Sequence, residues 1–244
     1  MSAEQSIDTQ IAKVGFWSII TAFVMLVLSL FFPLGAPEGY AATHAERVAW
    51  LSANGGDFII GWTIQIVWMS AWCVTMFVLA WKIANTSPIR AVVAAMVVLV
   101  SFVAFIIPKF MAIWTLPQLA DAVVHGEAGA DMANALLLIL NQSIPFSLFT
   151  SFDYLGFWMY AVFALLVACP LYQHAQQSLS LKICAIVLGA FGLLLHCMMF
   201  GVLAEIIVAT EIHNYVLPFF LMIFFAFAAA AIYFKPEIAS NAQV

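Results

Sequence analysis

Apolar stretches of about 20 residues, the length that crosses a bilayer as a helix, recur along nearly the whole chain. This recurrence constrains the fold more than any other feature of the sequence. Hydrophobic residues make up 66% of the chain and charged residues 8%, whereas soluble domains are roughly half apolar and a quarter charged. No soluble fold hides that much apolar surface, so we predict one all-α membrane domain covering residues 1–244.

Six of these stretches have the length of a spanning helix and turn-forming residues at their ends. Pro33 ends the first stretch, Pro108 marks a break after the third, Pro145 precedes the fourth and Pro170 closes it. The predicted spans are 14–32, 58–83, 89–107, 148–171, 181–208 and 215–234. The fold class is therefore an integral membrane bundle of six transmembrane helices.

The basic residues are distributed unevenly between the two sides of this predicted bundle. Five lie on the side of the N-terminus, namely Lys13, Lys82, Arg90, Lys182 and Lys235, and two lie on the other, namely Arg47 and Lys109. Because cytoplasmic loops carry the excess of lysine and arginine, this distribution predicts that both termini are cytoplasmic. The predicted location is the bacterial inner (plasma) membrane.

Two longer links, 33–57 and 108–147, lie on the outer side of the predicted bundle. In the first, Thr43 and Glu46 have the spacing of a capping box, which predicts a short amphipathic helix at the membrane surface. In the second, residues 117–147 combine a polar, glycine-interrupted half with an apolar run, 133–140, that is too short to span. They form either a pair of interfacial or re-entrant half-helices or an outer loop.

Most of the charged residues near the apolar stretches fall at the outer end of the bundle. Lys109 is predicted to end the third span, Asp153 to lie early in the fourth and Glu205 late in the fifth, with Glu211 and His213 in the link that follows. An ionised group in hydrocarbon costs several kcal/mol unless it is paired or hydrated. These five residues are therefore candidates for binding a ligand or handling protons. Either they share a partly buried cluster, or each reaches the headgroups alone.

His196 lies deep in the fifth span and shares a face with Gly189 and Gly192. Small residues let a second helix approach closely, and a histidine beside them is placed to bond across that contact. We therefore interpret His196 first as part of a helix contact. The alternatives are a proton-handling or substrate-binding group and a haem or metal ligand.

A stripe of side chains on the second span consists of Gly61, Gln65, Trp68 and Trp72, spaced by four, three and four residues. Gln65 is one turn from Trp68, whose indole N–H needs a partner in hydrocarbon. The stripe is either a seam between helices or the lining of an apolar cavity. Combined with Asp153 and the aromatic residues that share its face, it predicts an aromatic pocket with one carboxylate near the mouth.

Several kinds of chemistry have no support in the sequence. A net charge of −5 without a basic patch argues against nucleic-acid binding. We find no phosphate-binding loop, nucleophile elbow or zinc-hydrolase motif, so we predict no catalytic residues, no metal and no cofactor. A bis-histidine haem needs two histidines at similar depth, and only His196 is deep. A haem held by His196 and a methionine stays an alternative.

Three functions are compatible with these features. The first is a small inner-membrane protein that binds a lipid-like or apolar molecule in an outward-opening pocket, alone or as a subunit of a larger complex. The second is a proton-coupled secondary transporter that uses the outer-leaflet carboxylates. The third is a structural or accessory subunit. The expected partners are membrane lipids and either a membrane-protein subunit or a second copy of the chain, and an enzyme is the least expected class.

Overall fold

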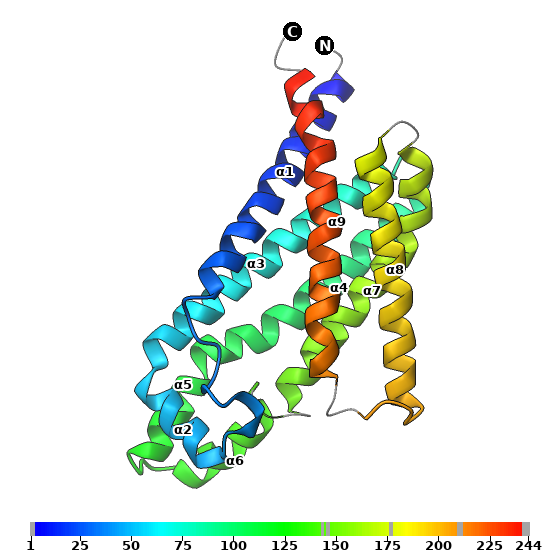
Figure 1. Ribbon diagram of the computed structural model, residues 1–244. Coiled ribbons are helices and arrows are strands. Elements are labelled where there is room, and N and C mark those ends of the chain that lie inside the picture. Colours follow the sequence, from blue (N-terminus) through cyan, green and yellow to red (C-terminus); the bar gives the residue numbers. More distant parts are fainter. Residues whose placement is uncertain (1–2, 143, 145–146, 176–177, 209–211, 241–244) are drawn as a thin grey trace. The chain divides into compact units, whose positions relative to one another are not determined.

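The computed structural model describes residues 3–142, 144, 147–175, 178–208 and 212–240, and within these it leaves the side chains of residues 3–6, 213–214 and 236–240 undescribed. The described part of the chain forms helices and contains no strand (Figure 1). The six long helices are α1 (Ala3–Ser29), α3 (Gly55–Lys82), α4 (Pro88–Trp114), α7 (Leu148–His174), α8 (Leu179–Leu203) and α9 (His213–Ser240). Each contains a segment long and apolar enough to cross a membrane, so the prediction of a multi-pass helical membrane protein is confirmed.

Four short elements fill the two predicted outer links. They are the 3₁₀ helix η1 (Gly39–Ala41) and the α-helices α2 (His44–Ala53), α5 (Leu116–Val124) and α6 (Ala130–Leu140). The capping box that was predicted for α2 is present, because the Thr43 hydroxyl accepts from the backbone N–H of Glu46 and the Glu46 carboxylate accepts from the backbone N–H of Thr43. The predicted role of Pro145 lies outside the described residues.

Several predicted helix boundaries differ from the structure, and three of the differences have a physical reason. Pro108 lies inside α4 and Pro170 inside α7, so neither proline ends its helix. A proline removes one backbone hydrogen bond, but apolar side chains on both sides of it favour continuing the helix in a membrane. The fifth span ends at Leu203 rather than at residue 208, because the chain after it turns back onto the helix.

The chain divides into two compact units. The first consists of residues 1–22, 70–101 and 157–244, and the second consists of residues 23–69 and 102–156. Four of the long helices, α1, α3, α4 and α7, contribute residues to both units. Each unit is described by itself below.

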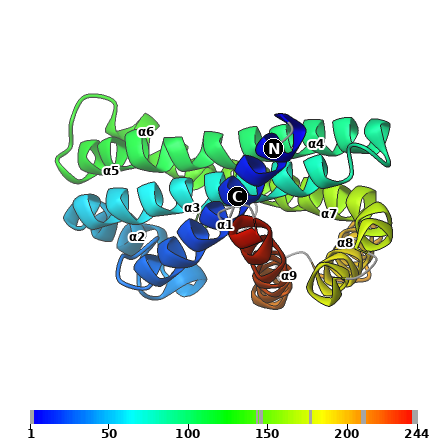
Figure 2. The ribbon, with the colours of Figure 1, turned by 90° about the horizontal axis from the view of Figure 1, so that it is seen from above.

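In the first unit, α8 and α9 pack side by side and run antiparallel (Figures 1 and 2). Glycines bring other helices close. A Cβ at Gly15 of α1 would lie 2.8 Å from Val78 of α3, and the Ser18 and Thr75 hydroxyls of the same two helices are 2.8 Å apart. This hydroxyl pair lies in the interior of the unit, so α1 and α3 are joined by packing and by one polar contact.

In the second unit, the short helices α2, α5 and α6 gather around one apolar core (Figure 1). Apolar side chains of α2, α5 and α6 pack in this core together with residues of α3, α4 and α7. The buried members of this core are Val48, Leu51, Phe58, Trp62, Ala112, Leu116, Ala120, Leu137 and Phe149. The two longer links therefore carry a packed cluster of helices, in which each short helix buries one apolar face against its neighbours.

Candidate functional site

Lys109 of α4 and Asp153 of α7 form an ion pair inside the second unit. The Lys109 Nζ atom donates to Asp153 Oδ1 over 2.7 Å. The lysine side chain is 3% exposed and the aspartate side chain 24% exposed. The sequence left open whether these charges are shared or reach the headgroups separately, and the structure shows them paired. Pairing offsets the cost of removing two ions from water, although it does not by itself add stability.

Three aromatic rings surround the Lys109 ammonium group. Its Nζ atom lies 4.7 Å from the ring centre of Phe105, 5.7 Å from that of Trp62 and 6.0 Å from that of Phe149. These distances are within the range of cation–π attraction. A Cβ at Gly156 would lie 2.7 Å from the Phe105 ring, so the glycine allows α7 to reach this ring. The ammonium therefore has one carboxylate partner and an apolar, aromatic surrounding.

Tyr40 of η1 is an electrostatic neighbour of Asp153 that the sequence reasoning missed. Burial raises the pKa of its phenol above the ordinary value, and the negative charge of Asp153 raises the pKa further. The Arg47 guanidinium holds this turn by donating to the backbone oxygens of Tyr40, over 2.9 Å, and of Gly39, over 3.4 Å. Because η1 is a single turn, no helical periodicity in the sequence marks Tyr40.

The predicted stripe on α3 is buried rather than open along its length in the second unit. Gln65 and Trp68 are both buried there. A Cβ at Gly61 would lie 2.8 Å from the backbone oxygen of Pro33, so this glycine is a point of close chain approach. The neighbouring Trp62 has an indole N–H that is buried and has no hydrogen-bond partner among the described residues. These positions form a packed seam.

Trp72, the last residue of the stripe, belongs to the first unit. It is 0% exposed, and its ring lies 5.0 Å from that of Phe224 and 6.2 Å from that of Tyr160, centre to centre. The Tyr160 hydroxyl lies 3.4 Å from the Cys73 sulfur. The chain's own aromatic side chains thus pack around this tryptophan.

His196 bonds within its own helix. Its Nδ1 atom lies 2.7 Å from the backbone oxygen of Gly192, which places the proton on Nδ1. Its ring packs edge-on against Trp158 of α7, with the ring centres 6.4 Å apart. A Cβ at Gly192 would lie 3.0 Å from the backbone oxygen of Ala161. The predicted close approach of a second helix to the glycines beside His196 is present, because α7 lies against Gly192 of α8. The hydrogen bond of His196 does not cross this contact, since its acceptor is in the same helix.

Glu205 does not lie in the fifth span, contrary to prediction. It follows the end of α8 in a left-handed backbone conformation, with φ of 59°, and it is exposed. The N–H of Glu205 donates to Val202 O and the N–H of Ile206 donates to Gly201 O, which is the Schellman pattern of a helix C-terminus. Glu211 lies outside the described residues, as does the side chain of His213.

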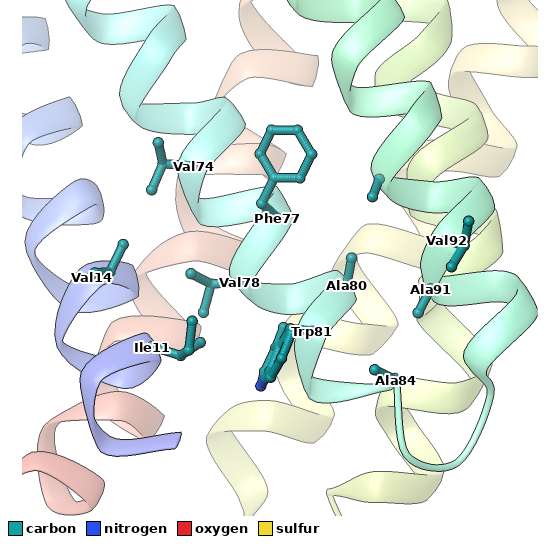
Figure 3. Close-up of a pocket in the computed structure, with 11 residues that line it drawn as sticks. Ile11, Val14, Val74, Phe77, Val78, Ala80, Trp81, Ala84, Ala91 and Val92 are labelled. Atoms are coloured by element: carbon teal, nitrogen blue, oxygen red, sulfur yellow. The ribbon is translucent and has the colours of Figure 1, made fainter. Parts of the chain in front are cut away.

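A groove of about 430 Å³ lies on one face of α3 in the first unit, with α1 and α4 on its two sides (Figure 3). We call it the α3 groove. Its lining side chains come from three helices and one turn, and they are Ile11, Val14, Val74, Phe77, Val78, Ala80, Trp81, Ala84, Ala91, Val92 and Ala95. All are apolar except for the indole nitrogen of Trp81. None of the candidate site residues predicted from the sequence is among these lining residues.

Trp81 supplies the polar edge of the α3 groove. Its ring is 49% exposed, and its Nε1 atom donates to Asp8 Oδ1 of α1 over 3.3 Å. Tryptophan is enriched at the boundary between hydrocarbon and headgroups, where its ring is in apolar surroundings and its N–H reaches a polar partner. The groove therefore combines an apolar floor with one carboxylate at its rim.

The described residues contain no group of three or more histidine, cysteine, aspartate or glutamate side chains placed to hold a metal ion. Comparison with known protein families, with curated proteins and with solved structures finds no match for this chain. Its function is therefore argued from the α3 groove and the Lys109–Asp153 pair.

Proposed function

We propose that this chain is a multi-pass protein of the bacterial inner membrane that binds an acyl chain, or an apolar molecule of similar shape, in the α3 groove. The observation that carries the proposal is the chemistry of the groove. Its volume of about 430 Å³ is in the range of small-molecule sites, and its lining is apolar apart from one indole nitrogen. Such a surface recognises its ligand by shape and by van der Waals contact.

The exposure of the groove supports a membrane lipid as the source of the bound acyl chain. Val74, Phe77 and Trp81 of α3 are 37%, 39% and 49% exposed, although most residues between 61 and 80 of this helix are buried. Lipid tails are as apolar as these side chains, so the surrounding bilayer exerts no hydrophobic force on a bound chain. Retention in the groove then rests on the close packing that a concave surface allows.

The orientation of the chain belongs to the same proposal. Lys82 and Arg90 are adjacent in sequence to the groove residues Trp81 and Ala91, and the uneven distribution of basic residues assigns both to the cytoplasmic side. We therefore place both termini in the cytoplasm and the α3 groove in the inner leaflet. The exposed apolar face of α6, formed by Met132, Leu138 and Ile139, supports an interfacial position for this helix at the outer side.

Native mass spectrometry of the protein released from lipid nanodiscs tests the proposal. We expect one lipid to remain bound to the unaltered chain, and we expect Ala84→Phe and Ala95→Phe to remove it by filling the groove. Ala135→Phe, on the exposed surface of α6, is the matched control and retains the lipid. Equal retention by all four proteins would contradict the proposal.

Proton-coupled transport is a second candidate, and the Lys109–Asp153 pair favours it. A carboxylate that is partly exposed and bonded to a buried lysine is able to exchange that partner for a proton or a substrate cation. Proteoliposomes containing a pH-sensitive dye and an imposed proton gradient provide the test. Substrate-dependent proton entry is expected to be lost in Asp153→Asn and kept in Glu205→Gln, because Glu205 is exposed beyond the end of α8.

A further inference from the structure

The carboxylate of Asp8 lies at the rim of the α3 groove and is held there by a hydrogen bond from the lining residue Trp81. Asp8 Oδ1 accepts the Trp81 indole N–H over 3.3 Å, and Asp8 is exposed. A carboxylate has acceptor sites beyond the one that this bond uses. Asp8 is therefore able to receive further hydrogen bonds from the headgroup of a lipid whose chain lies in the groove.

The nearby basic residues do not share this position. Lys82 directs its Nζ atom over the rings of Tyr233 and Phe234 on α9, 5.6 Å and 6.0 Å from their centres. Lys13 lies two positions after Ile11 on α1, and Arg90 lies two positions before Val92 on α4. At about 100° per residue, each of these two cations is about 100° or more around its helix from every groove-lining residue of that helix, so neither shares the face that lines the groove.

We propose that the α3 groove selects a lipid with a primary ammonium in its headgroup, a phosphatidylethanolamine, and that Asp8 binds this ammonium. This inference rests on the proposed function, since it requires that a lipid acyl chain lies in the α3 groove. The ammonium offers three N–H donors and a positive charge to the Asp8 carboxylate. A quaternary choline headgroup has the charge without the donors, and a glycerol headgroup has hydroxyl donors but no positive charge.

Lipid competition in nanodiscs, read by native mass spectrometry, tests the proposal with three headgroups on identical chains. We expect phosphatidylethanolamine to be retained about tenfold more than phosphatidylglycerol, which is the effect of one hydrogen bond to a charged group, with phosphatidylcholine between them. In Asp8→Asn the preference is expected to disappear while a lipid stays bound. The amide oxygen of asparagine still accepts from Trp81, so this variant removes the charge and keeps the contact.

Asp131→Asn is the matched control, because Asp131 is an exposed aspartate on α6 far from the groove-lining residues in sequence. It is expected to keep the tenfold preference. A bound lipid without headgroup preference, a preference for phosphatidylglycerol, or a preference that persists in Asp8→Asn would each overturn this inference and leave the proposed function intact. Retention of no lipid of any headgroup would instead contradict the proposed function.

Discussion

A lysine whose side chain is only 3% exposed makes the packing around it depend on one carboxylate. Lys109 has a single ion-pair partner among the described residues, Asp153, and the remaining contacts of its ammonium are to aromatic rings. The two charges are not equally buried, because the Asp153 side chain is 24% exposed. Removing the carboxylate therefore leaves a deeply buried cation, whereas removing the lysine leaves an anion that is still partly exposed.

Single and double substitutions of this pair are expected to differ in a defined order. Asp153→Asn is expected to lower the free energy of unfolding by about 3 kcal/mol, and Lys109→Met by about 1 kcal/mol. The double variant is expected to be more stable than Asp153→Asn alone, because no unpaired charge remains. Unfolding of the purified proteins in detergent, followed by circular dichroism, measures the order. Additive losses in the double variant would show that the two charges are not coupled.

Glu205 occupies a backbone conformation that favours glycine. Its φ of 59° places a side chain in the left-handed region, which costs a non-glycine residue about 1 kcal/mol. Glu205→Gly is therefore expected to raise the free energy of unfolding by up to about 1 kcal/mol, while Glu205→Gln leaves it unchanged. The same detergent unfolding measurement applies. A loss of stability in the glycine variant would contradict the Schellman ending of α8.

A helix end could be predicted from the sequence only where the contacts that fix it lie within a few consecutive residues. The capping box of α2 lies within four consecutive residues, Thr43 to Glu46, and the structure contains it as predicted. The fate of Pro108 depends on the apolar residues that continue α4 beyond it, so the proline alone misled the prediction. The end of α8 depends on a glutamate at the left-handed position, which no sequence rule for helix ends favours.

The same difference explains why the α3 groove was missed. The exposed groove residues Val74, Phe77 and Trp81 follow helical spacing, but every face of a spanning helix is apolar, so the spacing distinguishes no face from another. The predicted site residues were mostly polar or aromatic instead, and of these Gln65 and Trp68 are buried whereas Glu205 is exposed beyond the end of α8. Lys109 and Asp153 are the exception, because their charges in an apolar stretch required a partner.

The capping box gives α2 a defined response to acid. Hydrogen bonds from the hydroxyl and backbone N–H of Thr43 lower the pKa of Glu46 below its ordinary value of 4.5. A carboxylate whose pKa is lower in the folded state stabilises the fold above pH 4.5 and loses that contribution as the pH falls through the lowered pKa. The protection factors for amide hydrogen exchange in α2, which correct for the pH dependence of the intrinsic exchange rate, are therefore expected to fall below pH 4.5.

Two variants separate this effect from general acid unfolding. Glu46→Gln is expected to exchange faster at neutral pH and to lose the acid-dependent component. Thr43→Ala is expected to cost about 1 kcal/mol of local stability, as loss of an N-cap does. Protection factors in α2 that fall equally on acidification in Glu46→Gln and in the unaltered chain would assign the acid response to another group.

The composition of the chain predicts its class as a membrane protein, but it does not predict which helices pack against each other. A chain that is 66% hydrophobic requires spanning helices, and the structure contains six helices long and apolar enough to cross a membrane. The packing that makes a site depends on which helices meet, and that information is not local. Gly15, Gly61 and Gly156 show this, because each allows a close approach by a residue distant from its own helix turn.

Photo-crosslinking shows whether an acyl chain occupies the α3 groove. Phospholipids with a diazirine in the acyl chain are incorporated into nanodiscs with the protein, irradiated and mapped by peptide mass spectrometry. The proposal predicts that adducts concentrate on residues 11–14 and 74–95, and that Ala84→Phe removes them from these segments. Equal labelling of exposed apolar residues elsewhere, such as Leu193 of α8 and Phe225 of α9, would contradict it.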